Sequence, residues 1–464
     1  MTLSEHLARL ATETLSGDVP PAALTAASRM ILDSLATTIA GWREPACPEA
    51  AKRVATWGGA PEATVLIYGV RGPTPNVAYA NSAMCHALDF DDAYFETTMH
   101  IMSSVLPVSM AAAELAGASG RQLLDAVILG VEVAGRIGLI IQAAYTGYGF
   151  LPASVVGGFG ATAAASRLLG LTAHQTAHAL GLNYAQTSGN RQALIDTSLA
   201  KRIQPALTAR SALWAAMLAS DGITGPLHAL EGDAGLFRLY NRSEPPTPEA
   251  LMAPYDYWQI EHVSIKPYPC CGGNHRIIQA AIDLANAEDL QPEQIDHAQV
   301  WMPLVDVRLL RRPFELGRDP QVQAQFNAAY SAALALLRRR STLADYRPAT
   351  ITSGQDIIEL SRRVDVQVIP GSDTARTHEV AHELIVWTRD GRKLQRRVDL
   401  LHGQWQDPLT WDEIADKMRS CAQHAGNWSA ERLDALVADV AHLEEVPNVR
   451  RWIDDRLVVP GLIA

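Results

Sequence analysis

The sequence has few of the features that mark secreted and membrane-spanning proteins. Only 5 of its 464 residues are cysteine, and no CxxC pair occurs, so we expect a reducing, cytoplasmic location and no disulfide framework. The N-terminus has no basic segment followed by an apolar one, which argues against a signal peptide. The most apolar stretch, 126–144, is interrupted by Glu132 and Arg136, so we expect no membrane span and no membrane partner.

Positive charge is also scarce. The chain has 39 Lys and Arg residues against 50 Asp and Glu residues, which gives a net charge of −11. A general nucleic-acid-binding protein normally presents a basic face, so we expect no nucleic-acid partner. Charged residues make up 19% of the chain and hydrophobic residues 48%, a composition that excludes a largely disordered chain.

The first half of the chain is dense in alanine, with apolar residues at helical spacing. This pattern predicts helices over residues 4–15, 21–41, 102–115, 121–141, 154–169, 173–186 and 201–220. Ser4 is the candidate N-cap of the first helix, and the small-residue run 157–161 should let helices approach closely. Four glycines are expected at helix ends: Gly120, Gly170, Gly222 and Gly225.

The pattern changes near residue 262, where apolar and polar residues begin to alternate. Residues 297–302 and 364–369 are predicted strands, and a helix is predicted over 326–338. The segment 378–401 is a predicted hairpin, because two alternating runs flank Arg389-Asp390-Gly391.

Helical character returns at Thr410, which with Glu413 forms a capping-box pattern. We therefore expect a mainly α fold. A large all-helical domain, formed by 1–265 plus 404–464, should be interrupted by a smaller α+β lid domain at 266–403. Active sites often lie between two such domains.

The segment 86–92, followed by His100, gathers three carboxylates and two histidines within 15 residues. Carboxylates this close need a cation, a metal or hydrogen bonds to offset their repulsion. A proton-transfer site is our favoured interpretation, and a helix end with solvated charges is the plain alternative. His86 and Asp89 have metal-ligand spacing, but no matching cluster of further ligands occurs, so we expect no metal.

Two adjacent cations, Lys201 and Arg202, open a predicted helix whose following residues are apolar. Cations oppose the positive end of the helix dipole, so the pair suits an anionic ligand that the backbone N–H groups would also attract. Ordinary surface charge is the alternative.

The segment 266–275 carries paired prolines, cysteines and glycines, and predicts a hinge with Lys266 and His275 pointing into a cleft. A catalytic thiolate is the alternative, although no activating pair lies nearby in sequence. Tyr148, between two glycines, is a candidate acid or base, or else a surface aromatic. The sequence has no P-loop, no GxSxG and no dinucleotide fingerprint.

Together these segments resemble the 2-methylcitrate dehydratase (MmgE/PrpD) family over nearly the whole chain. The resemblance rests on segments 86–92, 147–157, 201–202, 230–237, 266–275 and 325–330 in this order. It implies a cofactor-free homodimer with a helical domain and an α+β lid. Family activities include 2-methylcitrate dehydration, cis-aconitate decarboxylation and iminodisuccinate epimerisation, so the expected partner is a small anionic di- or tricarboxylate.

The resemblance also implies roles for individual residues. Asp89 matches the first aspartate of the family's active-site motif, and His100 matches the histidine that closes it. Lys201 matches a lysine that binds the substrate carboxylate. Tyr330 matches an active-site tyrosine from the lid, and His275 falls in the family's junction motif.

The chemical step common to these activities is removal of a proton next to a carboxylate, which forms an enediolate-like anion. We expect Lys201 to stabilise that anion, and His100 and Tyr148 to act as acid and base, with Lys201 able to substitute for either. Asp89 is expected to orient His100 or another pocket base. The expected substrate-binding residues are His86, Arg191, Arg202, Lys266, His275 and Tyr330.

The sequence departs from the dehydratase and decarboxylase pattern at three places. Ala93, Leu151 and Ile203-Gln204 stand where those enzymes have threonine, histidine and Leu-His. The loss of three polar groups favours an isomerase like iminodisuccinate epimerase. A hydro-lyase like 2-methylcitrate dehydratase or a cis-aconitate-type decarboxylase is the alternative, and a non-catalytic ligand-binding member is the alternative of a different class.

Overall fold

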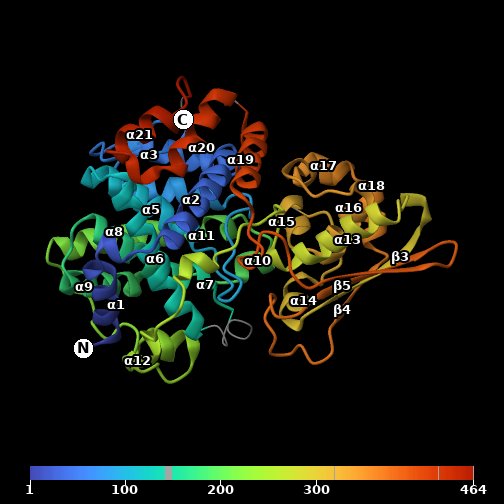
Figure 1. The fold of residues 1–464 in the computed structure, drawn as a ribbon, viewed down its shortest axis with the longest axis horizontal. Coiled ribbons are helices and arrows are strands. Elements are labelled where there is room, and N and C mark those ends of the chain that lie inside the picture. The colour runs from blue at the N-terminus through green and yellow to red at the C-terminus, as the bar shows by residue number, and fades with distance from the viewer. Residues whose placement is uncertain (142–148, 318, 427, 463–464) are drawn as a thin grey trace. The chain divides into compact units, whose positions relative to one another are not determined.

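The computed structural model describes residues 1–141, 149–317, 319–426 and 428–462, which form two compact units (Figure 1). The first unit contains Met1–Gln192, Ala200–Val263 and Thr410–Ala464, and the second contains Ala193–Leu199 and Ser264–Leu409. The short segment 193–199 thus belongs to the second unit, although helices of the first unit flank it in sequence. The predicted mainly α fold class is confirmed.

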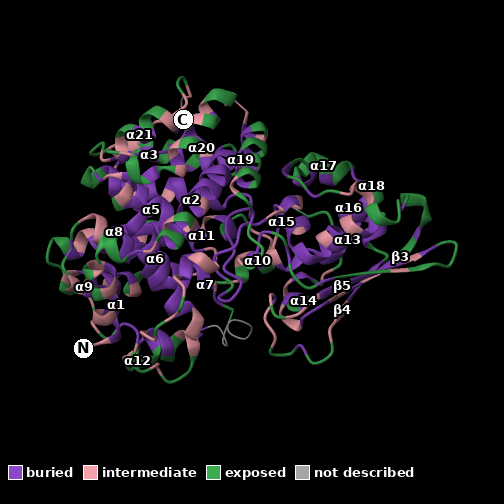
Figure 2. Ribbon diagram, in the orientation of Figure 1, coloured by how far each residue is buried: buried purple, intermediate pink, exposed green. Residues whose placement is uncertain are grey.

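The first unit is almost entirely helical. Its helices are α1 (Leu3–Glu13), α2 (Pro21–Gly41), α3 (Cys47–Trp57), α4 (Thr74–His86), α5 (Met102–Ala116), α6 (Gly120–Ile141), α7 (Pro152–Val155), α8 (Gly157–Leu168), α9 (Ala173–Gln186), α11 (Ala200–Ser220), α12 (Pro248–Leu251), α19 (Trp411–Ala425), α20 (Ala430–Ala441) and α21 (Val449–Arg456). A two-stranded antiparallel ribbon pairs β1 (Ala63–Thr64) with β2 (Arg71–Gly72). Figure 2 shows that α5 and α6 are buried along most of their length.

Small residues allow the central helices to pack closely. A Cβ atom added to Gly160 of α8 would lie 2.3 Å from the carbonyl oxygen of Gly130 in α6, so this crossing requires glycine. The prediction of close helix approach at 157–161 is confirmed. None of the helices among the described residues combines the length and apolar character needed to cross a membrane.

Three predictions about helix ends were wrong. The N-cap of α1 is Thr2, which forms a capping box with Glu5, whereas Ser4 is buried inside the helix. Gly120 begins α6 and does not end a helix, because its backbone N–H donates to the Val446 carbonyl and its Cα packs against Leu443. The single helix predicted over 154–169 is divided into α7 and α8 at Val156.

The second unit is built around one four-stranded sheet with the order β4-β3-β5-β6. Its strands are β3 (Ile295–Met302), β4 (Val364–Val368), β5 (His382–Thr388) and β6 (Lys393–Val398). Its helices are α13 (His275–Ala287), α14 (Leu304–Leu310), α15 (Pro320–Gln325), α16 (Ala328–Arg338), α17 (Pro348–Ser353) and α18 (Gln355–Ser361). Helix α10 (Gln192–Ile195) lies across the boundary between the two units in sequence.

The strand predictions are confirmed. Strand β3 pairs in parallel with β4, with Ala298 opposite Val364, and antiparallel with β5, with Val300 opposite Leu384. β5 and β6 form the predicted hairpin, and Gly391 in its turn has the positive φ of 89° that favours glycine. Helices α13 and α16 pack against each other and against this sheet, which buries one hydrophobic core.

The buried His382 of β5 should make the second unit sensitive to acid. Its Nε2 atom lies 3.4 Å from Asp306 Oδ2, yet burial outweighs this carboxylate and lowers the pKa of the histidine. The unfolded chain then binds the proton more readily than the native chain, so stability is kept above about pH 6.5 and falls as the pH drops below it. Between pH 7.5 and pH 5, the midpoint temperature of thermal unfolding should fall less steeply for His382→Gln than for the wild type. Equal slopes would contradict this prediction.

Candidate active site

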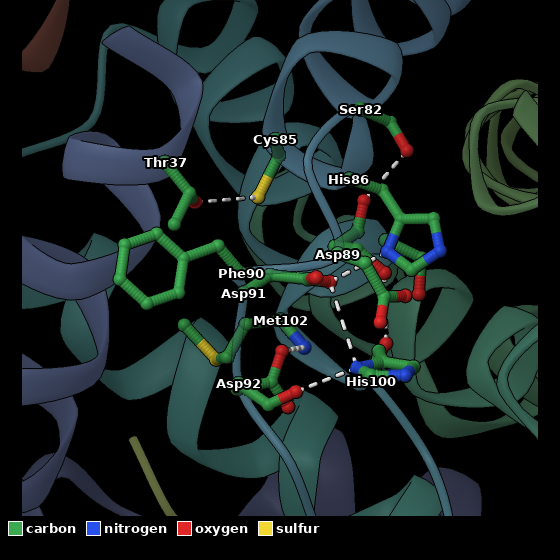
Figure 3. A network of polar contacts seen from close by, with 12 residues as sticks. Thr37, Ser82, Cys85, His86, Asp89, Phe90, Asp91, Asp92, His100 and Met102 are labelled. Atoms are coloured by element: carbon green, nitrogen blue, oxygen red, sulfur yellow. Dashed lines mark hydrogen bonds and ion pairs between the residues drawn. The ribbon is translucent and has the colours of Figure 1, made fainter. Parts of the chain in front are cut away.

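The loop between α4 and α5 places four titratable side chains together. His86 is the last residue of α4, and Asp89 has a positive φ of 54°, which turns the chain back toward α5. Asp92 then binds the first turn of α5, since its carboxylate accepts the N–H groups of Ile101 at 2.9 Å and Met102 at 3.1 Å. This closure brings the ring of His100 to 5.1 Å from the ring of His86 (Figure 3).

Lys201, near the start of α11, completes this group from a distant part of the chain. Its ammonium lies 3.1 Å from His86 Nε2 and forms an ion pair with the Asp89 carboxylate. The exposed fractions are 7% for the Lys201 side chain and 2% for that of Asp89. We call His86, Asp89, Asp91, His100 and Lys201 the proton-transfer cluster.

The hydrogen-bond partners determine which ring nitrogens carry protons. Asp91 Oδ2 lies 2.7 Å from His86 Nδ1, and a carboxylate accepts, so this Nδ1 carries the proton and Nε2 accepts from Lys201. The Asp92 carbonyl lies 2.6 Å from His100 Nδ1 and can only accept. In the neutral His100 ring the lone pair therefore belongs to Nε2. The His100 side chain is also more exposed than that of His86, at 23% against 2%.

The carboxylates of this loop are buried, so the interpretation as a helix end with solvated charges was wrong. Asp89, Asp91 and Asp92 are each at most 2% exposed. Burial and the neighbouring Asp91 raise the pKa of Asp92 well above its ordinary value, while its two backbone N–H bonds work against the rise. The Lys201 ammonium supplies the compensating positive charge beside Asp89.

A metal ion does not suit the same atoms. Ligand atoms of His86, Asp91 and His100 lie within 4.8 Å of one another. Both Nδ1 atoms carry protons in the tautomers above, and His86 Nε2 accepts from the Lys201 ammonium, so neither His86 nitrogen has a lone pair to offer. The expectation that this site holds no metal stays a prediction.

The structure shows which side chain Asp89 contacts. Asp89 forms its ion pair with Lys201, whereas His100 is oriented by the backbone carbonyl of Asp92. The aspartate bonded to a histidine is Asp91, which holds His86. Figure 3 shows the side chains of His86, Asp89, Asp91 and His100 turned toward one another.

Comparison with known proteins identifies the family of the chain. Residues 5–249 match the model of the MmgE/PrpD N-terminal domain, and residues 268–443 match that of the MmgE/PrpD C-terminal domain. The chain belongs to the MmgE/PrpD family. This confirms the resemblance read from the separated motifs.

Relatives of this MmgE/PrpD protein carry the name of one lyase. The cis-aconitate decarboxylase-like protein oryM of Aspergillus oryzae is 27% identical over 96% of this chain and 95% of its own length. Human cis-aconitate decarboxylase is 28% identical over 82% of this chain and 78% of its own length. Cis-aconitate decarboxylase of Aspergillus terreus is 28% identical over 96% of this chain and 94% of its own length.

Arg202 faces away from the proton-transfer cluster of this MmgE/PrpD protein. Its guanidinium lies 3.9 Å from Glu44, is only 3% exposed, and shares that carboxylate with His424 at 3.5 Å. Its neighbour Lys201 reaches the cluster because adjacent residues of a helix point in different directions. The structure therefore does not bring both cations to one anion site.

Three further candidates lie in the second unit, where they are buried. Lys266 is 1% exposed, and His275 is fully buried with its Nε2 atom 3.1 Å from the Cys270 carbonyl. Tyr330 packs against Phe314 with ring centroids 4.5 Å apart, and burial raises its pKa, so its hydroxyl remains protonated at neutral pH. Their roles in substrate binding stay predictions.

The glycine pair of the junction segment has a packing role. A Cβ atom on Gly273 would lie 2.6 Å from Asp306 Oδ1. Glycine is therefore required where the turn before α13 packs against α14. Arg191 lies next to the isolated bridge between Phe150 and Asn190, and its backbone N–H donates to the Gly149 carbonyl. The candidate acid or base Tyr148 lies outside the described residues.

Sequence reasoning missed two further side chains that support the loop, one from within it and one from outside. Tyr94 pairs with Met99 across the loop, and its hydroxyl donates to Gln259 Oε1 at 2.5 Å. Lys417 of α19 donates to the Phe90 carbonyl at 2.9 Å. No local motif marks these residues, because each acts on a segment more than 150 positions away; only the burial of a lysine on the apolar face of α19 could have drawn attention to Lys417.

Proposed function

We propose that this MmgE/PrpD protein is a lyase that decarboxylates a small polycarboxylate such as cis-aconitate, with no cofactor. One observation supports this proposal most directly. The buried Lys201 ammonium contacts His86 and Asp89, and it lies in the same cluster as His100, whose Nε2 atom can exchange a proton. The names of the relatives support decarboxylation as the reaction. We also propose a cytoplasmic location.

The proposed reaction balances with one proton. The bond between carbon and the leaving carboxylate breaks, CO2 departs, and the electron pair remains on the organic product, delocalised toward a neighbouring carboxylate. Lys201 stabilises this negative charge, and protonated His100 delivers a proton to carbon. Because the imidazole is neutral after the transfer, solvent must reprotonate it before the next cycle.

Epimerisation of a substrate like iminodisuccinate is the second candidate. Gln204, which stands where the dehydratases and the decarboxylase have a histidine, binds the backbone of Asn190 through both ends of its amide, at 2.7 and 3.0 Å. An amide engaged in this way supplies no acid for a departing hydroxide. This argues against dehydration, and because the decarboxylase shares that histidine, the change to glutamine favours epimerisation, which expels no hydroxide.

Proton NMR in D2O tests the proposal with cis-aconitate, citrate, 2-methylcitrate and the iminodisuccinate stereoisomers. Decarboxylation predicts a new alkene signal from cis-aconitate, deuterium at one carbon and an equal amount of released CO2. A new diastereomer with deuterium at the α carbon and no alkene would instead establish the epimerase. Loss of an alcohol with a new vinylic signal would establish the dehydratase.

We further propose that the protein is a homodimer. The exposed face of α11 carries Leu207 and Trp214, which are 46% and 48% exposed and lie two helical turns apart. Light scattering after size-exclusion chromatography measures the mass directly. A dimeric mass that Trp214→Glu reduces would support this face as the contact, and a monomeric wild type would refute the dimer.

A further inference from the structure

Beneath the proton-transfer cluster lies a buried ion pair that the proposed chemistry does not use. Asp33 of α2 is fully buried, and Lys417 of α19 is 8% exposed. The Lys417 ammonium lies 2.6 Å from Asp33 Oδ1, 2.9 Å from the Phe90 carbonyl oxygen and 3.8 Å from the centre of the Phe90 ring. One cation thus contacts both the backbone and the side chain of a single residue.

Phe90 lies between the two aspartates whose carboxylates belong to the proton-transfer cluster. It follows Asp89, whose left-handed backbone conformation is unfavourable for a residue with a side chain, and it precedes Asp91, which holds His86. The Phe90 carbonyl belongs to the peptide that joins Phe90 to Asp91, and the amide of Phe90 is bonded directly to Asp89, so the conformation of Phe90 bears on both neighbouring carboxylates. Figure 3 shows the Phe90 ring extending away from the two histidines, and the Lys417 ammonium lies against this ring.

We propose that Lys417 is a positioning residue, which acts through the Phe90 carbonyl to hold Asp89 against Lys201 and Asp91 against His86. Asp33 balances the charge of Lys417 and fixes the direction of its ammonium. Helix α19, which lies in the last segment of the first unit, therefore forms part of the catalytic framework. Only the activity measurement below rests on the proposed function.

A purely structural role, in which Lys417 merely docks α19, is the competing explanation. Other contacts already dock this helix to the region at the end of α2. Trp42 Nε1 donates to the Ala425 carbonyl at 3.3 Å, and His424 lies 3.5 Å from Glu44. Docking contacts of this kind do not reach the loop, whereas Lys417 does.

The experiment compares three variants with the wild type. Lys417→Met alone would take from the buried Asp33 carboxylate the ammonium that lies 2.6 Å away, so the main variant is the double substitution Asp33→Asn with Lys417→Met. Lys417→Arg keeps the charge and guards against a double variant that does not fold. Arg419→Met is the matched control, because Arg419 lies on the same helix, is half exposed and pairs only with Asp416 and Asp434 among the described contacts.

Two readouts are measured on the full-length protein. In the first, the double variant should lower kcat on the substrate identified by NMR by about 10-fold to 100-fold, with KM changed far less, because misplacement of acid and base affects chemistry more than binding. In the second, the imidazole NMR signals of His86 and His100 should move in the ligand-free double variant, and by a smaller amount in Lys417→Arg. His86→Gln and His100→Gln assign these signals, and Arg419→Met should change neither readout.

The histidine readout separates failure of this inference from failure of the proposed function. If the wild type acts on none of the substrates, the proposed function fails, yet the signals of His86 and His100 still report whether Lys417 holds the loop. Unmoved histidine signals in a folded double variant would overturn the inference. An equal response in Arg419→Met would overturn it too, because it would show a general effect of altering α19.

Discussion

Lys201→Met should abolish turnover and destabilise the first unit at the same time. The substitution removes the ammonium that lies between His86 and Asp89 and leaves a buried carboxylate without its cation. Breaking a buried pair in this way costs about 3–5 kcal/mol of folding free energy. Loss of charge stabilisation at the reacting carbon adds a fall in kcat of about 10²-fold to 10³-fold, judged by removal of comparable groups in other enzymes.

A second substitution separates these two effects. Lys201→Met combined with Asp89→Asn removes both charges, so urea denaturation should show much of the lost stability restored. Turnover should remain absent, because no cation has returned to the site. Recovery of turnover along with stability would show that Lys201 serves only to compensate Asp89, and would exclude its role in charge stabilisation.

His100→Gln should have the second largest effect, and it should be confined to the chemistry. The imidazole Nε2 atom is the proposed proton carrier, and removal of such a group lowers kcat by about 10²-fold to 10⁴-fold. The side chain is 23% exposed, bonds to the Asp92 carbonyl and lies 3.8 Å from Asp91 Oδ2. The midpoint of thermal unfolding should therefore change far less than it does in Lys201→Met, which breaks a more deeply buried ion pair. Deuterium incorporation from D2O into the product or the α carbon measures the proton transfer directly.

The controls for His100 are chosen to keep or to lose its backbone contact. In His100→Asn the amide nitrogen can replace Nδ1 as donor to the Asp92 carbonyl, yet no group that can carry the proton remains, so it should be as inactive as His100→Gln. His228→Gln is the matched surface control, because His228 is 69% exposed and lies in the same unit. Full activity in His100→Gln would remove His100 from the mechanism.

The local pattern of the sequence predicted most of the secondary structure. The helices over 21–41 and 173–186 have the predicted bounds, because their apolar periodicity is unbroken and Pro21 and Thr172 mark where they begin. The hairpin was predictable because its turn carries Asp390-Gly391 between two alternating runs. The division at Val156 was not, since the small residues on either side of it carry no sequence signal for a break.

The site was predictable only in part, because a local pattern shows which residues are present but not which of them meet. His86, Asp89 and His100 stand close together in the sequence, and Lys201 was identified by its adjacent cation and by the resemblance. The sequence did not determine their pairing: Asp89 was expected to orient His100 or another pocket base, and the left-handed turn at Asp89 directs its carboxylate to Lys201. The direction of Arg202 toward Glu44 likewise depended on which face of α11 is buried.

By itself, the sequence determined the helical first unit, the strands of the second unit and the membership in the MmgE/PrpD family, since these follow from periodicity, turn residues and ordered motifs. Only the tertiary structure decided which carboxylate meets which cation or histidine. Lys201 lies 115 positions from His86, and Lys417 lies 327 positions from Phe90. Contacts over such separations arise from helix packing, which buries particular faces together, and no local pattern of residues encodes their geometry.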